Sequence, residues 1–346
     1  MKTSSENPDS NILGNGLNES DIAQAVRASG YPLQIIVSKI LSKKFYLIEE
    51  WSYLDNDTER TIDLLAEIRL FEFSEPQPRV RPTLNLLIEC KQSDLPYIFF
   101  ISPGKPYVPK FPNITGLSSE NVVITSDDDP SSWNYSALQA LGLHLHPFLS
   151  EQPKFCMTFS KCARKGKNIE LSGSAPFQGL VFPLLKAVSH FKEVEKPPET
   201  AWYFDAHLAL GLAVLDAPMV GVRVTEDGNE LELIPWARVV RHQSTESSAW
   251  SQRASSNAID VVHADYLAQY IQGKLMPFAE EFSKLALKHQ HVLAEGRGFV
   301  SGMGQESRTN IEPRLQKAKF KDTAKRYKAI GNNIMKFLKG KKANHT

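Results

Sequence analysis

The chain has few cysteines and lacks the signatures of several large protein classes. Its 346 residues include three cysteines, at positions 90, 156 and 162, and no CxxC pair. Three cysteines do not make a disulfide framework, and their spacing does not suit a zinc site. No run reaches the roughly 18 apolar residues that cross a bilayer, and the polar N-terminus has no signal-peptide core. We therefore expect a cytoplasmic protein without a membrane span.

Motifs for nucleotide binding and for serine catalysis are also absent. There is no GxxxxGK[ST], and the glycines between 296 and 304 neither follow a convincing strand nor open a long helix. Ser160 and Ser172 lack a nucleophile-elbow context. His144 and His146 have a spacing that suits a metal only on a strand, whereas their segment has a helical pattern. An ATP-driven motor and a serine hydrolase are therefore not indicated.

Charge is unevenly distributed along the chain. The net charge is +1, but residues 311–346 hold 11 Lys/Arg and 2 Asp/Glu, a net of +9. The remaining 29 basic and 37 acidic residues give −8 for residues 1–310. A mildly acidic body with a basic tail suggests a polyanionic partner. A solvated tail without any partner is the alternative.

Apolar periodicity predicts an α/β protein. Residues 1–18 are polar and are expected to be disordered. After the helix-breaking Gly30 and a Pro at 32, helical spacing predicts a helix to Leu41. Period-two patterns and β-forming residues then predict strands over 45–53, 61–73, 84–92 and 97–101. A helix followed by a meander of strands is typical of an α/β or α+β core.

The second half of the chain is predicted to be rich in strands and to complete the same sheet. We expect strands near 208–214, 220–224, 231–241 and 258–263, helices over 132–149, 177–191 and 266–289, and a loop over 294–312. A basic amphipathic helix is expected over 313–342. The predicted organisation is a core over 19–150 and an additional α/β region over 151–295 that packs on it.

Charged residues inside two apolar strands point to a function. The segment 60–66 carries Asp63, and the segment 86–92 carries Glu89 and Lys91. Alternate residues of a strand face the same side, so Glu89 and Lys91 project together while Cys90 faces the other way. If the two strands pair as a hairpin, Asp63 reaches the same site. Two carboxylates and an ammonium suit a divalent metal and a phosphodiester; a structural ion pair at a sheet edge is the alternative.

This pattern resembles the nuclease core of the PD-(D/E)xK superfamily, the restriction-endonuclease-like fold. That core has a helix, three antiparallel strands, a second helix and a further strand, with the acid on the second strand and the acid-x-Lys on the third. The resemblance spans roughly residues 30–101. The segments that carry it are Gly30-Tyr-Pro32 and the following helix, Trp51-Ser-Tyr53, Arg60-Thr-Ile-Asp63 and Ile88-Glu-Cys-Lys-Gln92.

The resemblance implies a metal-dependent phosphodiesterase acting on DNA, in phage defence or DNA processing. Asp63, Glu89 and the carbonyl of Cys90 would bind Mg²⁺ or Mn²⁺, since Mg²⁺ prefers oxygen ligands. The metal would activate water and polarise the phosphate. Lys91 would orient the water or neutralise developing charge, and Gln92 would hold the phosphate or the water.

One position departs from the family pattern. Many members carry a glutamate on the first helix, and the corresponding residue here is Gln34. Glu49 or Glu50 could replace it, although we place both before a strand and not on that helix. The departure keeps a second hypothesis open, a catalytically weakened nuclease fold that binds nucleic acid or acts as a scaffold.

The basic tail is the second predicted contact with nucleic acid. An anionic membrane surface or the body of the protein are alternative partners for such an amphipathic helix. Double-strand cutting would suit a homodimer. The residues expected to contact phosphates are Lys317, Lys319, Lys321, Lys325, Arg326 and Lys328.

Overall fold

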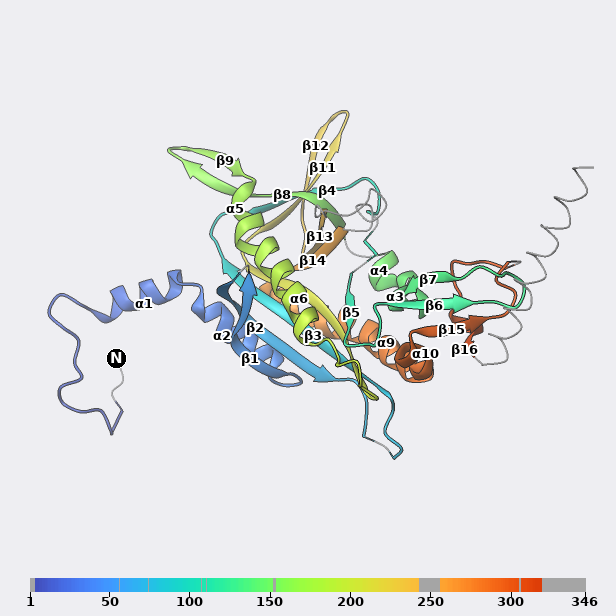
Figure 1. The fold of residues 1–346 in the computed structure, drawn as a ribbon. Coiled ribbons are helices and arrows are strands. Elements are labelled where there is room, and N and C mark those ends of the chain that lie inside the picture. Colours follow the sequence, from blue (N-terminus) through green and yellow to red (C-terminus); the bar gives the residue numbers. More distant parts are fainter. Residues whose placement is uncertain are drawn as a thin grey trace, which may run out of the picture.

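The protein is a mixed α/β structure built around one large sheet (Figure 1). A computed structural model describes residues 4–318 except 56, 74, 107, 110, 152–153, 243–255 and 305. Residues 4–18 contain turns, and α1 (Glu19–Ala28) follows them without burying any residue. None of the helices in the described part has the length and apolar character that crossing a bilayer requires.

The large sheet mixes strands from both halves of the chain. Its order is β1-β2-β3-β10-β14-β13-β8-β4-β11-β12, with β5 on β10 and β9 on β8. The N-terminal strands β1, β2 and β3 pair antiparallel. β3 then pairs parallel with β10, which lies more than a hundred residues further along the chain. The bounds are β1 Tyr46–Asp55, β2 Thr58–Arg69, β3 Val80–Gln92, β4 Tyr97–Ile101, β5 Asn113–Thr115, β8 Lys154–Lys165, β9 Asn168–Ser172, β10 Phe204–Asp216, β11 Met219–Thr225, β12 Gly228–Leu233, β13 Trp236–His242 and β14 Ser256–His263.

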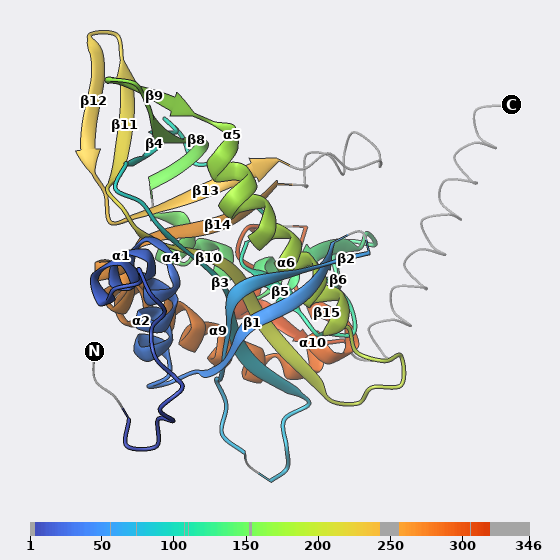
Figure 2. The same ribbon diagram turned by 90° about the vertical axis from the view of Figure 1, so that its left-hand side faces the viewer.

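Helices cover both faces of this sheet (Figure 2). On one face, which we call the α6 face, α6 (Phe182–Val194) packs on β10 and the strands beside it. The opposite face, the α9 face, carries α2 (Tyr31–Leu41) and α9 (Met276–Lys288). Gly211 lets α6 approach closely, because a Cβ there would lie 3.2 Å from the Leu184 Cβ. The shorter helices are α3 Ala137–Ala140, α4 Pro147–Ser150, α5 Ser174–Pro176, α8 Leu267–Tyr270 and α10 Gln290–Glu295, with 3₁₀ turns at 143–145, 264–266 and 312–314 and π segments at 177–181 and 271–275.

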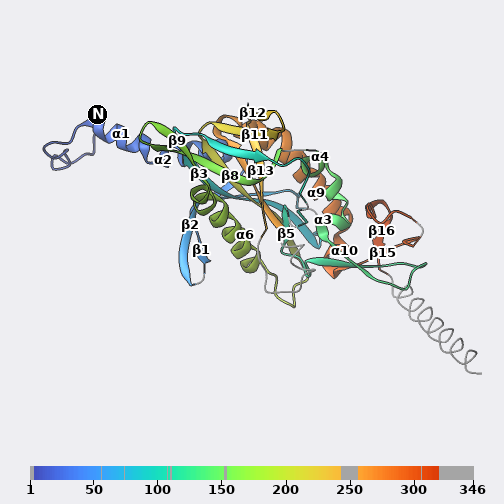
Figure 3. The same cartoon turned by 90° about the horizontal axis from the view of Figure 1, so that it is seen from above.

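A second sheet lies at the far end of the molecule from α1, α2 and β1 (Figures 1 and 3). It has four strands in the order β16-β15-β6-β7. β15 pairs parallel with β6, so the end of the described chain folds back onto a segment from its first half. The bounds are β6 Asn121–Thr125, β7 Trp133–Ser136, β15 Arg297–Val300 and β16 Leu315–Lys317.

The predicted α/β class and the N-terminal helix–strand order are confirmed, whereas several later elements differ. The single helix predicted over 132–149 is wrong: residues 133–136 form β7, and Gly142 at φ 69° separates α3 from the 3₁₀ turn after it. The strand predicted over 231–241 is two strands, because Pro235 lacks the N–H that a ladder needs. The predicted loop 294–312 contains β15. The predicted terminal helix begins instead with a 3₁₀ turn and β16, and most of its length lies outside the described residues.

Candidate active site

The antiparallel pairing of β2 and β3 places Asp63 beside Glu89. The paired residues run from Arg69 opposite Thr83 to Leu64 opposite Ile88. One step further in the same register, Asp63 lies next to Glu89. At this step a side chain replaces the backbone hydrogen bonding between the strands. The Cys90 N–H donates a hydrogen bond to the Asp63 Oδ2 at 2.6 Å.

Glu89 is buried and has one ammonium partner. The Lys91 Nζ lies 2.5 Å from the Glu89 Oε1. The Glu89 side chain is 10% exposed and that of Lys91 is 40% exposed, so the pair runs from the protein interior towards solvent. Cys90, between them, faces the α9 side and packs in its apolar cluster. The spacing therefore separates a charged face of β3 from an apolar one, as alternation predicts.

At this site, strands β1 and β2 each change the face of the sheet towards which their alternate side chains point. Ile62 packs on the α6 face and Leu64 on the α9 face, although residues two apart on a regular strand share a face. On β1, Leu47 packs on the α9 face and Trp51 on the α6 face, so this strand reverses between them as well. The register is the same before and after the reversal, so neither strand contains an inserted residue. The reversal is centred on Glu50, whose φ of 49° is left-handed.

Helix α2 fixes this irregular point through Gln34. The Gln34 Nε2 donates to the Glu50 Oε1 at 3.0 Å and to the main-chain carbonyl of Asp63 at 3.1 Å. Gln34 is only 6% exposed. One turn along the helix, the Ser38 Oγ donates to the Glu49 Oε1 at 2.8 Å. The uncharged Gln34 amide thus donates to the Asp63 carbonyl, which lies at the reversal, and also to the Glu50 carboxylate of β1.

Burial and mutual repulsion disfavour the charged forms of the carboxyl groups. Burial raises the pKa of Glu89 to about 7, with further increases from Asp63 and Glu50 that Lys91 opposes. Burial also raises the pKa of Asp63, against the Cys90 hydrogen bond and Lys91. Burial works to lower the pKa of Lys91, but Glu89 and Asp63 outweigh it and the pKa is raised. The cluster therefore has more negative charge than its one ammonium balances.

The oxygen atoms of this cluster suit a hard divalent cation. The Asp63 and Glu89 carboxyl groups are close enough for Asp63 to raise the pKa of Glu89. In an extended strand the N–H and C=O of one residue point the same way, so the Cys90 carbonyl is also on the β2 side. Mg²⁺ and Mn²⁺ take such oxygen ligands and keep several waters. Within the described ranges, no group of three or more His, Cys, Asp or Glu side chains is arranged to hold a metal ion.

Two sets of predicted site residues lie away from this cluster. Gln92 ends β3 and lines an open pocket with Asp94, Asp216 and His263. Lys317 lies in the distant second sheet, where its Nζ is 3.0 Å from the Glu295 Oε1. The structure thus brings neither residue to Asp63. Lys319, Lys321, Lys325, Arg326 and Lys328 lie outside the described residues.

Glu50 is the site residue for which the sequence-based placement was inconsistent. It lies within β1, as the predicted strand over 45–53 implies, and not before a strand; it is opposite Asp63 and raises the pKa of both Asp63 and Glu89. A left-handed conformation is rare for glutamate, and no sequence pattern indicates it. The adjacent pair of glutamates in an otherwise apolar strand was the only available signal.

Comparison with known proteins finds no matching family model, no matching curated protein and no matching solved structure.

Proposed function

We propose that this chain is a metal-dependent nuclease that hydrolyses phosphodiester bonds in DNA. The observation that carries the proposal is the hydrogen bond from the Cys90 N–H to the Asp63 carboxylate. It ties an acid on one strand to the acid-x-Lys of the next, where Glu89 and Lys91 are in contact. Buried carboxylates with raised pKa values are typical of functional sites.

The order of elements supports the same proposal. α2 precedes three antiparallel strands, and α6 precedes β10, which lies parallel to β3. This is the order expected from the PD-(D/E)xK resemblance, with residues 93–203 between β3 and β10 holding further strands and helices. The acid lies on the second strand of the series and the acid-x-Lys on the third.

The proposed ligands of Mg²⁺ or Mn²⁺ are Asp63, Glu89 and the Cys90 carbonyl. When bound, the ion polarises the phosphate and lowers the pKa of a coordinated water. A bound cation would stabilise the charged forms of the two carboxyl groups, which burial and, to a smaller extent, repulsion between carboxylates disfavour. Glu89 must lose its proton for the ion to bind, so metal affinity rises with pH around neutrality.

Lys91 acts in this proposal as a fixed positive charge. Its pKa is raised by Glu89 and Asp63, so it remains an ammonium at neutral pH and is not the base that activates water. Its partly exposed position lets it donate to a phosphate oxygen on which negative charge develops. Gln34 orients Glu50 and the Asp63 backbone and supplies no charge of its own.

Cleavage of DNA by the purified protein tests this function. Supercoiled and linear DNA would be incubated with Mg²⁺, with Mn²⁺ or with EDTA. We expect metal-dependent cleavage that Asp63→Asn, Glu89→Gln and Lys91→Ala each reduce by at least about a hundredfold. Arg223→Ala, an exposed substitution on β11, is the control for handling and should retain full activity. Activity that survives all three site substitutions contradicts the proposal.

A binding measurement separates the metal site from the chemistry. Titration of Mn²⁺ by calorimetry in two buffers of different ionisation enthalpy reports both affinity and released protons. We expect proton release near pH 7 in the wild type and none in Glu89→Gln. Equal Mn²⁺ affinity in the wild type and the variant would remove Glu89 from the ligand set.

The second hypothesis, a weakened nuclease fold, rests on the neutral Gln34 on α2. The contact of Gln34 with Glu50 brings a carboxylate close to the site from β1 instead, which favours retained activity. Salt-sensitive DNA binding without cleavage under any metal would select the second hypothesis. For location we propose the cytoplasm, in keeping with three free, buried cysteines.

A further inference from the structure

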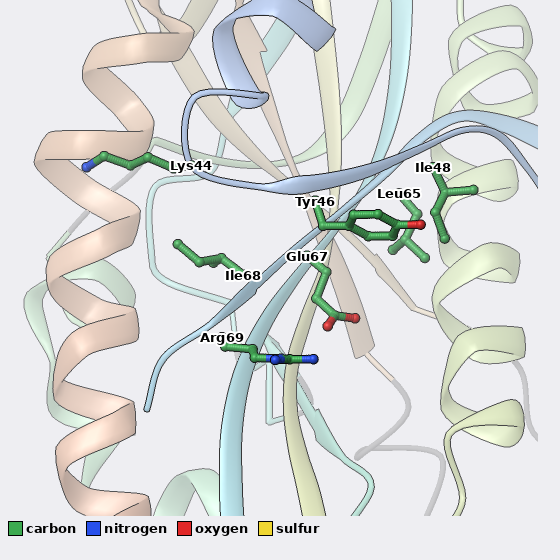
Figure 4. Close-up of a pocket in the computed structure, with 7 residues that line it drawn as sticks. All are labelled: Lys44, Tyr46, Ile48, Leu65, Glu67, Ile68 and Arg69. Atoms are coloured by element: carbon green, nitrogen blue, oxygen red, sulfur yellow. The ribbon is translucent and has the colours of Figure 1, made fainter. Parts of the chain in front are cut away.

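A groove lies on the outer part of the β1–β2 hairpin, beside the candidate active site. It has a volume of about 570 Å³. Its lining comes from neighbouring positions of the two strands, since Tyr46 pairs with Glu67 and Ile48 with Leu65. Leu65 belongs to the α6 face, the face towards which Glu89 also projects. The lining residues are Lys44, Tyr46, Ile48, Leu65, Glu67, Ile68 and Arg69 (Figure 4).

An exposed aromatic ring forms part of the groove. Tyr46 is 71% exposed, and Ile48 beside it is 40% exposed. Figure 4 shows the Tyr46 ring pointing towards Ile48 and Leu65, with Glu67 and Arg69 below it and Lys44 extending away from the ring. A large ring left open to solvent beside aliphatic side chains offers a flat stacking surface.

The charged side chains of the groove favour an anion. Lys44 and Arg69 both line it, and neither forms an ion pair with a carboxylate in the part of the chain that the structure describes. The Arg69 guanidinium instead lies over the Phe73 ring, with its carbon 5.5 Å from the ring centroid. Glu67 is the one acidic residue of the lining. Two cations and one carboxylate leave a net positive charge.

The groove lies close, along the two strands, to the positions of Asp63 and Glu50. Leu65 is two residues from Asp63 on β2, and Ile48 is two residues from Glu50 on β1. At about 3.3 Å per strand residue, the groove begins about 7 Å from those carboxyl-bearing positions. A chain bound in the groove therefore ends about two strand residues short of the positions of Asp63 and Glu50.

We propose that this groove binds single-stranded nucleic acid, with one base stacked on Tyr46 and phosphates held by Lys44 and Arg69. The proposal deepens the proposed nuclease function and rests on it for the direction of the strand towards Asp63. Stacking on a protein ring needs an unpaired base, because bases in a duplex already stack on each other. The structure thus favours a single strand, or a frayed end, over an intact duplex.

Fluorescence anisotropy with a labelled 12-nucleotide DNA single strand tests the groove. The measurement is made in EDTA, so that metal-dependent cleavage does not consume the probe. We expect Tyr46→Ala to weaken binding roughly 5- to 150-fold, the loss of one base–aromatic stack. Tyr46→Trp should retain the affinity. A matched control is Tyr31→Ala, which removes a tyrosine that is 68% exposed on α2, outside the groove.

The salt dependence of the same binding tests the phosphate contacts. Lys44→Ala and Arg69→Ala should each reduce the slope of log affinity against log salt by about 1. Lys167→Ala, at the exposed tip between β8 and β9, should leave the slope unchanged. Glu67→Gln should tighten binding, because it removes the only carboxylate of the lining.

Three results would overturn the proposal: no binding of the single strand by the wild type, equal effects of Tyr46→Ala and Tyr31→Ala, or equal competition by a blunt duplex. The two proposals fail separately. Cleavage that depends on Asp63 but binding that ignores Tyr46 removes the groove alone. Binding that depends on Tyr46 without metal-dependent cleavage removes the nuclease alone.

Discussion

Two buried groups of charges in this protein differ in how fully they are paired. Arg238 and Asp260, which are 1% and 0% exposed as side chains, form a bidentate pair at 2.7 and 2.9 Å. The Tyr270 hydroxyl donates to Asp260 at 2.8 Å, and Arg238 donates to the Phe148 carbonyl at 3.1 Å. In the β2–β3 site, by contrast, the Asp63 and Glu89 carboxyl groups have only the Lys91 ammonium near them, and the pKa of each carboxyl group is raised.

The difference separates a fully paired network from the incompletely paired candidate active site. Aromatic rings enclose the Arg238 guanidinium, whose carbon lies 4.3 Å from the Phe111 ring centroid and 4.7 Å from that of Phe148. Asp260 and the Phe148 carbonyl thus accept the hydrogen bonds of the Arg238 guanidinium without a ligand. The excess negative charge around Asp63 and Glu89 is reduced only by protons or by a cation. Burial alone therefore does not distinguish the two groups; incomplete pairing in contact with solvent does.

Breaking the Arg238–Asp260 pair should have the largest effect on stability. Asp260→Ala leaves a buried guanidinium without its counter-ion and should cost about 3–5 kcal/mol of unfolding free energy. The double substitution Arg238→Met with Asp260→Leu removes both charges and should be much less harmful. Urea unfolding followed by tryptophan fluorescence measures both. Equal losses in the single and double variants would contradict the view that an unpaired charge is the main cost.

Removing the charge of Glu89 should raise the unfolding free energy, in contrast to the loss expected for Asp260→Ala. Its folded pKa of about 7 lies above the ordinary 4.5. The contribution to stability is therefore full below about pH 4.5 and is lost as the pH rises through 7. In EDTA, Glu89→Gln should be more stable than the wild type at pH 8, by up to about 3 kcal/mol, and no more stable at pH 4.5.

Thermal unfolding between pH 4.5 and pH 8 tests this dependence. Mg²⁺ should then stabilise the wild type at pH 8 and leave Glu89→Gln unchanged. A variant that is less stable than the wild type at every pH would place Glu89 among structural ion pairs, like Asp260.

A smaller gain is expected from Glu50→Gly. Glycine accepts the left-handed φ of 49° that strains a glutamate, so stability should rise by up to about 1 kcal/mol while Mn²⁺ binding weakens. Ser52→Gly, at an exposed position of the same strand with ordinary pairing, should instead lower stability by about 0.5–1 kcal/mol. Calorimetric Mn²⁺ titration and thermal unfolding of both variants check the contrast. Matching losses of stability would show that Glu50 is not strained.

The smallest effect should come from an exposed ion pair. Arg223 and Glu230 lie 3.3 Å apart across the β11–β12 hairpin, with side chains 61% and 65% exposed. Arg223→Ala should change unfolding free energy by less than about 1 kcal/mol, because solvent screens the pair. Urea unfolding measures this change too. A larger loss would mean that pairing outweighs burial in deciding what an ion pair contributes.

The hairpin with Asp63, Glu89 and Lys91 was predictable because its signals are local. Apolar residues at period two identify β2 and β3, and the same period places Glu89 and Lys91 together. The facing reversal was not predictable, because a left-handed Glu50 is stabilised by Gln34 on another element. The Arg238–Asp260 pair leaves no local pattern either, because its two residues are 22 positions apart on different strands. The sequence likewise could not show that Trp133–Ser136 would pair with β6 in place of forming a helix.

The parallel pairing of β3 with β10 has a consequence for synthesis. A ribosome releases residues 46–92 as a three-stranded unit whose outer strand has no neighbour until residues 204–216 emerge. At about 5–20 residues per second, that interval is on the order of ten seconds. During this time the nascent chain exposes the unpaired N–H and C=O groups along the long edge of β3, which can pair with a strand of another chain.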